Sequence, residues 1–306
     1  MIRLFGAEMR RIAARRVVRL TAVLALVAIA GGGVLAFVKT HSLSEAAFTE
    51  RVQQATAQRE IQRAQVDACL KAHGQSPDRE IPDRVAAQCF PQKEARAHDP
   101  RFHRTRLKGV LQGTSGVLLI VTWALGASIV GAEFASRSMT TLLTWETRRT
   151  RVFVTKTVAV LITMGLFAAT VLALMTLAML PALLAHGAPG HGEPAFATFA
   201  GVIGRGTALA ALGAAMGFAI ASIGRNTAVA LGVGFAYIVI LENILGSSIA
   251  GWRRWLLLGN VIVFVSGNTS RDVAGRSVTG AAIFLTIVAV TLLTAAATTF
   301  RVRDIA

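Results

Sequence analysis

Residues 131–156, GAEFASRSMTTLLTWETRRTRVFVTK, decide how the chain is interpreted, because they form a charged break between two long apolar runs. The stretch contains two glutamates, four arginines and one lysine, together with the apolar Leu142, Leu143 and Trp145. Charges at this density make it too polar to cross a bilayer. The mixture predicts a short helix on the inner surface of a membrane protein, where a soluble partner can contact it.

The composition places the chain among integral membrane proteins. Of its 306 residues, 54% are hydrophobic, and several uncharged runs approach the length of about 20 residues that a membrane-spanning helix needs. The net charge of +16 comes without a groove-reading or base-stacking motif, so we expect lipid head groups rather than nucleic acid as partners. Abundant Ala, Arg, Val and Gly are typical of GC-rich bacterial genomes, which favours a bacterial cell membrane.

The expected fold is an all-α integral membrane protein with six transmembrane helices. Fourteen basic residues fall on the predicted inner segments and four on the short outer loops, so both termini are expected in the cytoplasm. A signal peptide is the alternative for the N-terminus. The expected segments are an interfacial amphipathic helix at 1–16, spans at 17–38, 109–130, 152–184, 196–223, 227–245 and 278–300, a mostly helical outer domain at 39–108, an inner helical region at 131–151, an outer segment at 246–277 and a tail at 301–306.

The outer domain contains the only two cysteines of the chain, Cys69 and Cys89. The sequence Ser42-Leu43-Ser44-Glu45 is typical of a capping box with Ser42 as the cap, followed by a polar helix to about His73. Two cysteines confined to one exported segment favour a Cys69–Cys89 disulfide. The alternative is a metal site that combines both cysteines with His73, although their spacing is not a standard one.

Two ionisable residues, Arg205 and Glu242, fall inside the predicted fourth and fifth spans. Both lie in the outer half of the membrane at similar depth, and because isolated charges are expensive there, we expect an intramembrane ion pair. The alternatives are a polar lining of a substrate path and an Arg205 side chain that reaches the outer surface. Residues 252–265 are too short an apolar segment to cross alone, so they either re-enter the membrane under cover of protein or lie on it.

The chain lacks the sequence motifs of common catalytic and nucleotide-binding sites. It has no P-loop, HExxH, GxSxG or CxxC sequence, so we expect no catalytic residue, no bound cofactor and no metal site. The loop with His186, His191 and Glu193 is interpreted as a solvated outer turn. An intramembrane enzyme would depend on Glu242 or on the outer histidines, and a proton-coupled carrier would depend on Glu242 as its relay.

The pattern resembles one family, the permease subunits of exporter-type (type-two) ABC transporters. The resemblance rests on Gly131-Ala132-Glu133-Phe134, Arg137-Ser138-Met139-Thr140-Thr141-Leu142-Leu143, Arg148-Arg149-Thr150-Arg151-Val152 and Lys156, which are similar to the segments around the coupling helix of that family. Six spans, an interfacial N-terminal helix, a membrane-dipping segment before the last span and Asn226-Thr227-Ala228-Val229-Ala230 at the start of the fifth span also resemble the family.

The resemblance implies an ATP-driven exporter. Two permeases, identical or homologous, would stand on two cytoplasmic ABC ATPase subunits that bind the ATP and Mg, so this chain would not itself be an enzyme. The residues expected to contact the ATPase are Glu133, Phe134, Arg137, Leu142, Leu143, Trp145, Arg148 and Arg149. The alternatives are a basic loop held to lipid phosphates and, for the whole chain, a membrane scaffold or sensor whose outer domain binds a ligand.

Overall fold

The computed structural model describes residues 2–73, 89, 99–145, 148–188, 194–245, 252–268 and 275–302. Within these residues every regular element is a helix, and six helices are long and apolar enough to cross a membrane. Both findings agree with the fold expected from the sequence. The chain divides into two compact units, which are described separately. Unit 1 comprises Met1–Val34, Arg104–Leu180 and Gly190–Ala306, and unit 2 comprises Leu35–His103 and Pro181–Pro189.

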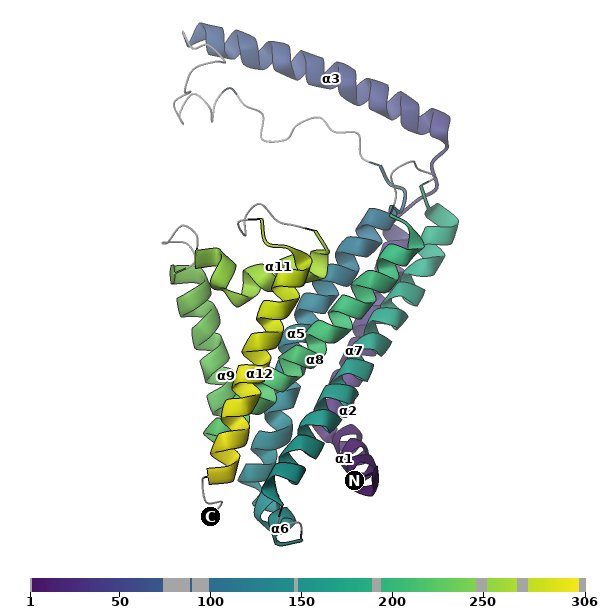
Figure 1. The fold of residues 1–306 in the computed structure, drawn as a ribbon. Helices are drawn as coiled ribbons and strands as arrows, with labels where there is room; N and C mark the ends of the chain where they lie inside the picture. Colours follow the sequence, from purple (N-terminus) through teal and green to yellow (C-terminus); the bar gives the residue numbers. More distant parts are fainter. Residues whose placement is uncertain are drawn as a thin grey trace. The chain divides into compact units, whose positions relative to one another are not determined.

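The helices follow the order of the predicted segments (Figure 1). They are α1 (Ile2–Ala14), α2 (Arg16–Lys39), α3 (Glu45–Ala72), α5 (Arg104–Ala135), α6 (Ser138–Trp145), α7 (Arg149–His186), α8 (Phe196–Gly224), α9 (Thr227–Ala236), the π-helical η1 (Tyr237–Leu245), the 3₁₀-helical η2 (Trp252–Trp255), α11 (Leu257–Ser266) and α12 (Val278–Val302). The start of α1, the end of α12 and α6 lie at one end of unit 1 (Figure 1).

The centre of unit 1 is the close contact between α5 and α8, which run side by side (Figure 1). Gly213 and Gly217 of α8 lie against α5, and a Cβ atom added at Gly217 would collide with the backbone and ring of Trp123. The hydroxyl of Thr122 on α5 donates a hydrogen bond of 2.8 Å to the carbonyl of Ala210 on α8. Small residues at such a contact allow two helix backbones to approach each other closely.

The structure gives different roles to the two GxxxG sequences of the chain. A Cβ atom added at Gly109 or Gly113 of α5 meets no atom within 4 Å, so this GxxxG sequence makes no close helix contact in the structure. The GxxxG sequence of α8 makes the tight one. The spacing of the glycines could not distinguish the two sequences, because it does not say which helix, if any, packs against them.

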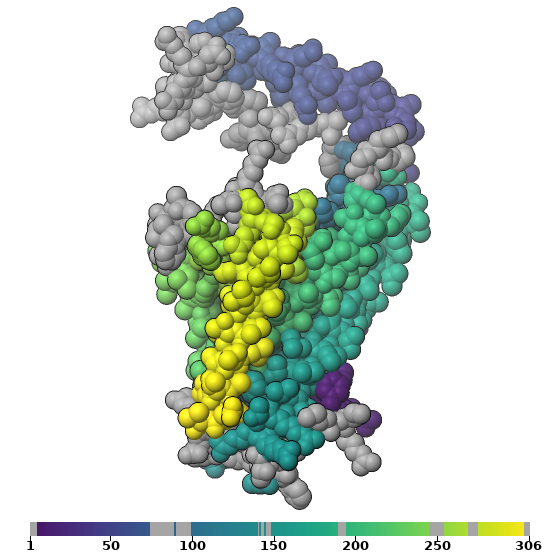
Figure 2. All heavy atoms as spheres, in the orientation of Figure 1, coloured from purple at the N-terminus to yellow at the C-terminus, as the bar shows by residue number. Residues whose placement is uncertain are grey.

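Apolar side chains cover much of the outside of unit 1. The exposed residues of α2 include Leu20, Leu24 and Val27, and the buried residues of this helix are Ile29 and Gly33. α12 is visible along one face in the space-filling view, in agreement with its exposed isoleucines (Figure 2). Apolar patches of this extent are rare on soluble monomers, and they match the lipid-facing surface of membrane-spanning helices.

Unit 2 is organised around the buried guanidinium of Arg101, which is 4% exposed. It forms salt bridges of 2.9 Å to Asp99 and 3.0 Å to Glu45, and it lies 4.2 Å from the ring centroid of Phe48. Glu45 is the first residue of α3, so Arg101 anchors the start of that helix. The N-cap is Ser44, whose hydroxyl accepts a hydrogen bond from a backbone amide. The predicted cap, Ser42, was therefore wrong by two residues, because Glu45 is used by Arg101.

Asp99 makes this anchor sensitive to acid. Burial raises the pKa of Asp99, but hydrogen bonds from the side chain and backbone of Arg101 and the charges of Arg101 and His103 together outweigh it. The pKa of Asp99 therefore lies below its ordinary value of 3.8. A carboxyl group with a lowered pKa stabilises the fold above the unfolded-state pKa of about 3.9, and this contribution disappears as the pH falls through the folded-state pKa.

We predict that the start of α3 loses protection in acid. Hydrogen exchange of the α3 amides, measured by mass spectrometry, should accelerate as the pH drops below about 4 after correction for the intrinsic exchange rate. Asp99→Asn should exchange faster than the native protein at neutral pH and should lose most of this pH dependence. Glu60→Gln, on an exposed part of α3, is the control. Identical pH profiles for the native protein and Asp99→Asn would contradict the anchor.

We predict that the two glycine pairs respond differently to one added methyl group. Gly217→Ala should destabilise the protein by about 1–3 kcal/mol, the usual cost of overpacking. Gly109→Ala should leave stability unchanged or raise it by up to about 1 kcal/mol, because alanine favours a helix. Thermal unfolding in detergent measures both. Equal midpoints for the two variants would show that the α5–α8 contact tolerates a side chain at Gly217.

Candidate functional site

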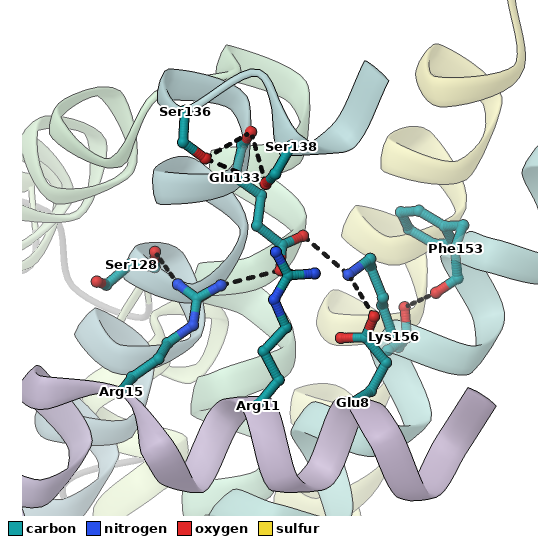
Figure 3. A network of polar contacts seen from close by, with 10 residues as sticks. Glu8, Arg11, Arg15, Ser128, Glu133, Ser136, Ser138, Phe153 and Lys156 are labelled. Atoms are coloured by element: carbon teal, nitrogen blue, oxygen red, sulfur yellow. Dashed lines mark hydrogen bonds and ion pairs between the residues drawn. The ribbon is translucent and has the colours of Figure 1, made fainter. Parts of the chain in front are cut away.

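The candidate site is a cluster of five charged side chains where α1, α5 and α7 meet (Figure 3). We define the Glu133 cluster as Glu8, Arg11, Arg15, Glu133 and Lys156. Three of its members lie on or directly after α1 with spacings of three and four residues, so they project from one side of the helix. One acid and two bases therefore face the same neighbours, α5 and α7.

Glu133, on the last turn of α5, is the centre of the cluster (Figure 3). Its side chain is 3% exposed, and one carboxylate oxygen lies 2.9 Å from Nη2 of Arg15 while the other lies 2.9 Å from Nζ of Lys156. Nζ of Lys156 is also 2.9 Å from Oε1 of Glu8. The two acids therefore share one lysine, and the contact joins α1, α5 and α7 through a single buried carboxylate.

The backbone of Glu133 participates as well as its side chain. Ser136 and Ser138 direct their hydroxyls at the Glu133 carbonyl, at 3.5 and 3.4 Å (Figure 3). Ser138 is the first residue of α6, so these contacts connect the end of α5 to the start of α6. Between the two serines, Arg137 adopts a left-handed conformation with φ of 55°, which turns the chain into α6. Glu133 thus couples α6 to the buried charges.

The charges of the cluster are nearly balanced. Two carboxylates face Lys156 and Arg15 at close range, whereas Arg11 lies 3.9 Å from Glu133 with a side chain that is 46% exposed. A buried ion pair gives little net stability, but removal of one partner leaves an uncompensated charge and costs about 3–5 kcal/mol. The cluster is therefore stable only when α1, α5 and α7 hold the positions that keep these ion pairs together.

The cluster changes the role expected for Glu133. Glu133 is buried and has close intramolecular partners in the structure, and its contact with a soluble partner stays a prediction. Phe134 is also partly buried against the apolar core of unit 1. The other predicted contacts differ: Arg137 and Arg148 are exposed, and Nη1 of Arg149 lies 3.5 Å from the carbonyl of Arg301. The side chains of Leu142, Leu143 and Trp145 lie outside the described residues.

Sequence reasoning missed Glu8 and underused Lys156. Glu8 is the single acid among the basic residues of α1, which was the available signal, because an acid there lowers affinity for anionic lipid unless a base pairs with it. Lys156 contributed to the family resemblance but was not selected as a site residue. Both side chains are buried, at 6% and 4% exposed, and a buried charge is almost always paired.

The expected ion pair between Arg205 and Glu242 does not form, although both residues are described. Oε1 of Glu242 accepts a hydrogen bond of 2.7 Å from the amide of Leu258, and the hydroxyl of Tyr237 accepts one of 2.9 Å from the amide of Leu257. These are the first two amides of α11, whose N-cap residue Leu256 provides no side-chain bond of its own. The Glu242 carboxylate therefore caps the N-terminus of α11.

Arg205 lies at the opposite end of the same helix. A Cβ atom added at Gly267, the C-cap of α11, would lie 2.6 Å from Nη2 of Arg205. The ten residues of α11 correspond to about 15 Å, which is too far for an ion pair. A helix favours an anion at its N-terminus and a cation at its C-terminus. The helix dipole thus replaces the predicted direct contact between Arg205 and Glu242.

The remaining candidates from the sequence lie in unit 2 or outside the described residues. Cys69 and Cys89 form a disulfide, with Cα atoms 5.5 Å apart. His186 lies 3.1 Å from the hydroxyl of Thr40, and its neighbours in the predicted outer turn, His191 and Glu193, lie outside the described residues.

Comparison of the chain with protein-family models, with curated proteins and with solved structures finds no match. The role of the Glu133 cluster is therefore argued from its own geometry. That geometry connects the surface helix α6, through buried charges, to two long apolar helices and to α1.

We predict that Lys156 and Arg11 differ sharply in their effect on stability. Lys156→Met should cost about 3–5 kcal/mol, because it removes the cation shared by two buried carboxylates. Arg11→Ala should cost about 1 kcal/mol or less, as for an exposed ion pair. Thermal unfolding in detergent tests the ranking, and Glu8→Gln combined with Lys156→Met should be less destabilising than the sum of the single variants. Equal losses of stability for Lys156→Met and Arg11→Ala would contradict this role of the buried ion pairs.

Proposed function

We propose that the chain is the membrane-spanning permease subunit of an ATP-driven ABC exporter in a bacterial cell membrane. The observation that carries the proposal is the connection of α6 to the Glu133 cluster. A short helix between two spans, tied by its neighbouring glutamate to the buried ends of α1, α5 and α7, is suited to transmit a movement from a soluble subunit into the membrane.

The positions of the chain ends support the orientation that the proposal needs. α6, the start of α1 and the end of α12 lie at one end of unit 1. The predicted inner segments hold fourteen basic residues and the short outer loops hold four. An excess of Lys and Arg marks the cytoplasmic side of a membrane protein. α6 would then face the cytoplasm, where an ATPase subunit could bind it.

The mechanism follows from how the helices are joined. In the proposed complex, closure of two ATPase subunits on ATP and Mg pushes α6. Because Ser138 contacts the carbonyl of Glu133, and Glu133 is held by Lys156 and Arg15, the movement passes to α5, α7 and α1 together. Rigid-body movement of packed helices is the usual way in which such a local displacement opens one side of a membrane protein and closes the other.

Exposed positive charge supplies the proposed contact with the ATPase. Arg148 lies immediately before α7 and is exposed. Charged side chains at the rim of an interface set its register and its rate of association, whereas apolar side chains at its centre supply most of the affinity. We therefore assign Arg137 and Arg148 to the rim of the contact, and Leu142, Leu143 and Trp145 to its centre.

The proposal is tested by isolating the tagged protein from its native membrane in mild detergent and identifying the co-purifying proteins by mass spectrometry. A stoichiometric P-loop ATPase is the expected result, and a second permease of different sequence would indicate a heterodimer. A clean preparation without an ATPase, under conditions that preserve a known transporter complex, would contradict the proposal. It would favour the scaffold or sensor with unit 2 as its ligand-binding part.

We predict that Arg148→Glu weakens the complex without unfolding the permease. Reversal of one rim charge should lower the yield of co-purified ATPase, and the difference should shrink at high salt because screening weakens the charge contact. Arg51→Glu, on the exposed surface of α3 in unit 2, is the matched control and should leave the yield unchanged. An unchanged yield for Arg148→Glu at low and high salt would remove Arg148 from the contact.

A further inference from the structure

Unit 2 brings together the three side chains that the sequence suggested as a metal site in place of the disulfide, although their spacing is not a standard one. Cys69 and His73 lie one helical turn apart at the end of α3, and Cys89 joins them from a separate part of the chain. The ligand-bearing atoms of the three residues lie within 4.8 Å of one another. The Nδ1 atom of His73 is 4.0 Å from Sγ of Cys69 and 3.9 Å from Sγ of Cys89.

We propose that the reduced form of the Cys69–Cys89 pair binds one Zn²⁺-like divalent ion, with His73 as the third protein ligand. Two thiolates and one imidazole are the donors that zinc prefers. The proposal concerns unit 2 alone and does not depend on the transport function.

The sulfur–nitrogen distances need only a small change to accept the ion. Zinc binds sulfur at about 2.3 Å and nitrogen at about 2.0–2.1 Å, so in a tetrahedral site a sulfur and a nitrogen ligand are separated by about 3.5 Å. The two sulfur–nitrogen distances are already within about half an ångström of that value. Once the disulfide opens, the two sulfurs have to move apart to make room for the ion.

His73 is held in a suitable position by the backbone. Its Nδ1 lies 2.9 Å from the carbonyl oxygen of Cys69, which can only accept, so Nδ1 donates this hydrogen bond. Nδ1 is also the ring nitrogen whose distances to the two sulfurs are given above, so binding of the ion through Nδ1 requires release of this hydrogen bond and transfer of the ring proton to Nε2.

Burial differs across the three ligands in a way that suits an open site. Cys89 is buried, Cys69 is partly exposed and His73 is exposed. The ion would thus have protein on one side and water on the other, and a water molecule would complete four-coordination. Three protein ligands with one open position are typical of zinc sites that exchange ligands.

The chemistry balances with a thiol reductant as the named co-reactant. A dithiol gives two electrons and two protons to the disulfide; the sulfur–sulfur bond breaks, Cys69 and Cys89 become thiols and the reductant becomes a disulfide. Zn²⁺ then displaces the two thiol protons, which are released to solvent. A covalent link between α3 and Cys89 is thereby replaced by a metal link between the same residues.

The test uses the full-length protein in detergent, with Co²⁺ as the spectroscopic probe. After reduction and removal of the reductant under anaerobic conditions, the protein should bind one equivalent of Co²⁺ with a thiolate-to-metal charge-transfer band. The oxidised protein and the double variant Cys69→Ser with Cys89→Ser should show no such band. Reduced protein without the band, or oxidised protein with an equal band, would overturn the proposal.

His73→Ala separates a three-ligand site from two reactive thiols. Its affinity for Co²⁺ should fall by at least about tenfold, which is the lower limit for loss of even an outer-shell partner of a metal. His41→Ala, a histidine elsewhere in unit 2, should bind as the native protein does. Zn²⁺ should also slow alkylation of both thiols in the reduced native protein and do so less in His73→Ala. Equal affinity and equal protection in the native protein and His73→Ala would exclude His73 as a ligand.

Discussion

One buried carboxylate, that of Glu133, determines how the α6 end of unit 1 is assembled. Its two oxygens contact Arg15 and Lys156, and its carbonyl receives the serine hydroxyls that begin α6. A charge removed from water is tolerated only when opposite charges and hydrogen bonds surround it. The burial of this charge therefore favours one mutual arrangement of α1, α5, α6 and α7.

The same physical rule explains the charges around α11 in unit 1. Glu242 and Arg205 are each too costly to leave alone in an apolar layer. Each lies at one end of α11, where free amides and free carbonyls present partial charges of opposite sign. A short helix can thus balance two charges that lie too far apart to meet. α11 in turn packs on α8 and α12 through Val261, Val263 and Val265.

Between these ends, packing rather than charge sets the contact. α5 and α8 approach closely because small residues of α8 face the α5 backbone, and one buried hydroxyl–carbonyl bond joins them. Helices in lipid associate through such contacts, since lipid provides no hydrophobic drive for their association. Unit 2 uses the opposite strategy: the polar helix α3 is held by Arg101 and by the Cys69–Cys89 disulfide.

The sequence by itself determined the number of apolar helices, the all-helical class and the residues that carry charge at unusual places, because hydropathy and charge are properties of local windows. Tertiary packing settled which charges meet: Glu133 lies against Lys156, and Glu242 and Arg205 lie at opposite ends of α11. It also placed Gly213 and Gly217, rather than Gly109 and Gly113, at the helix contact. Partners of this kind are more than 20 residues apart or lie on different helices. Their choice depends on how helices are rotated and stacked, which the local pattern of one segment does not specify.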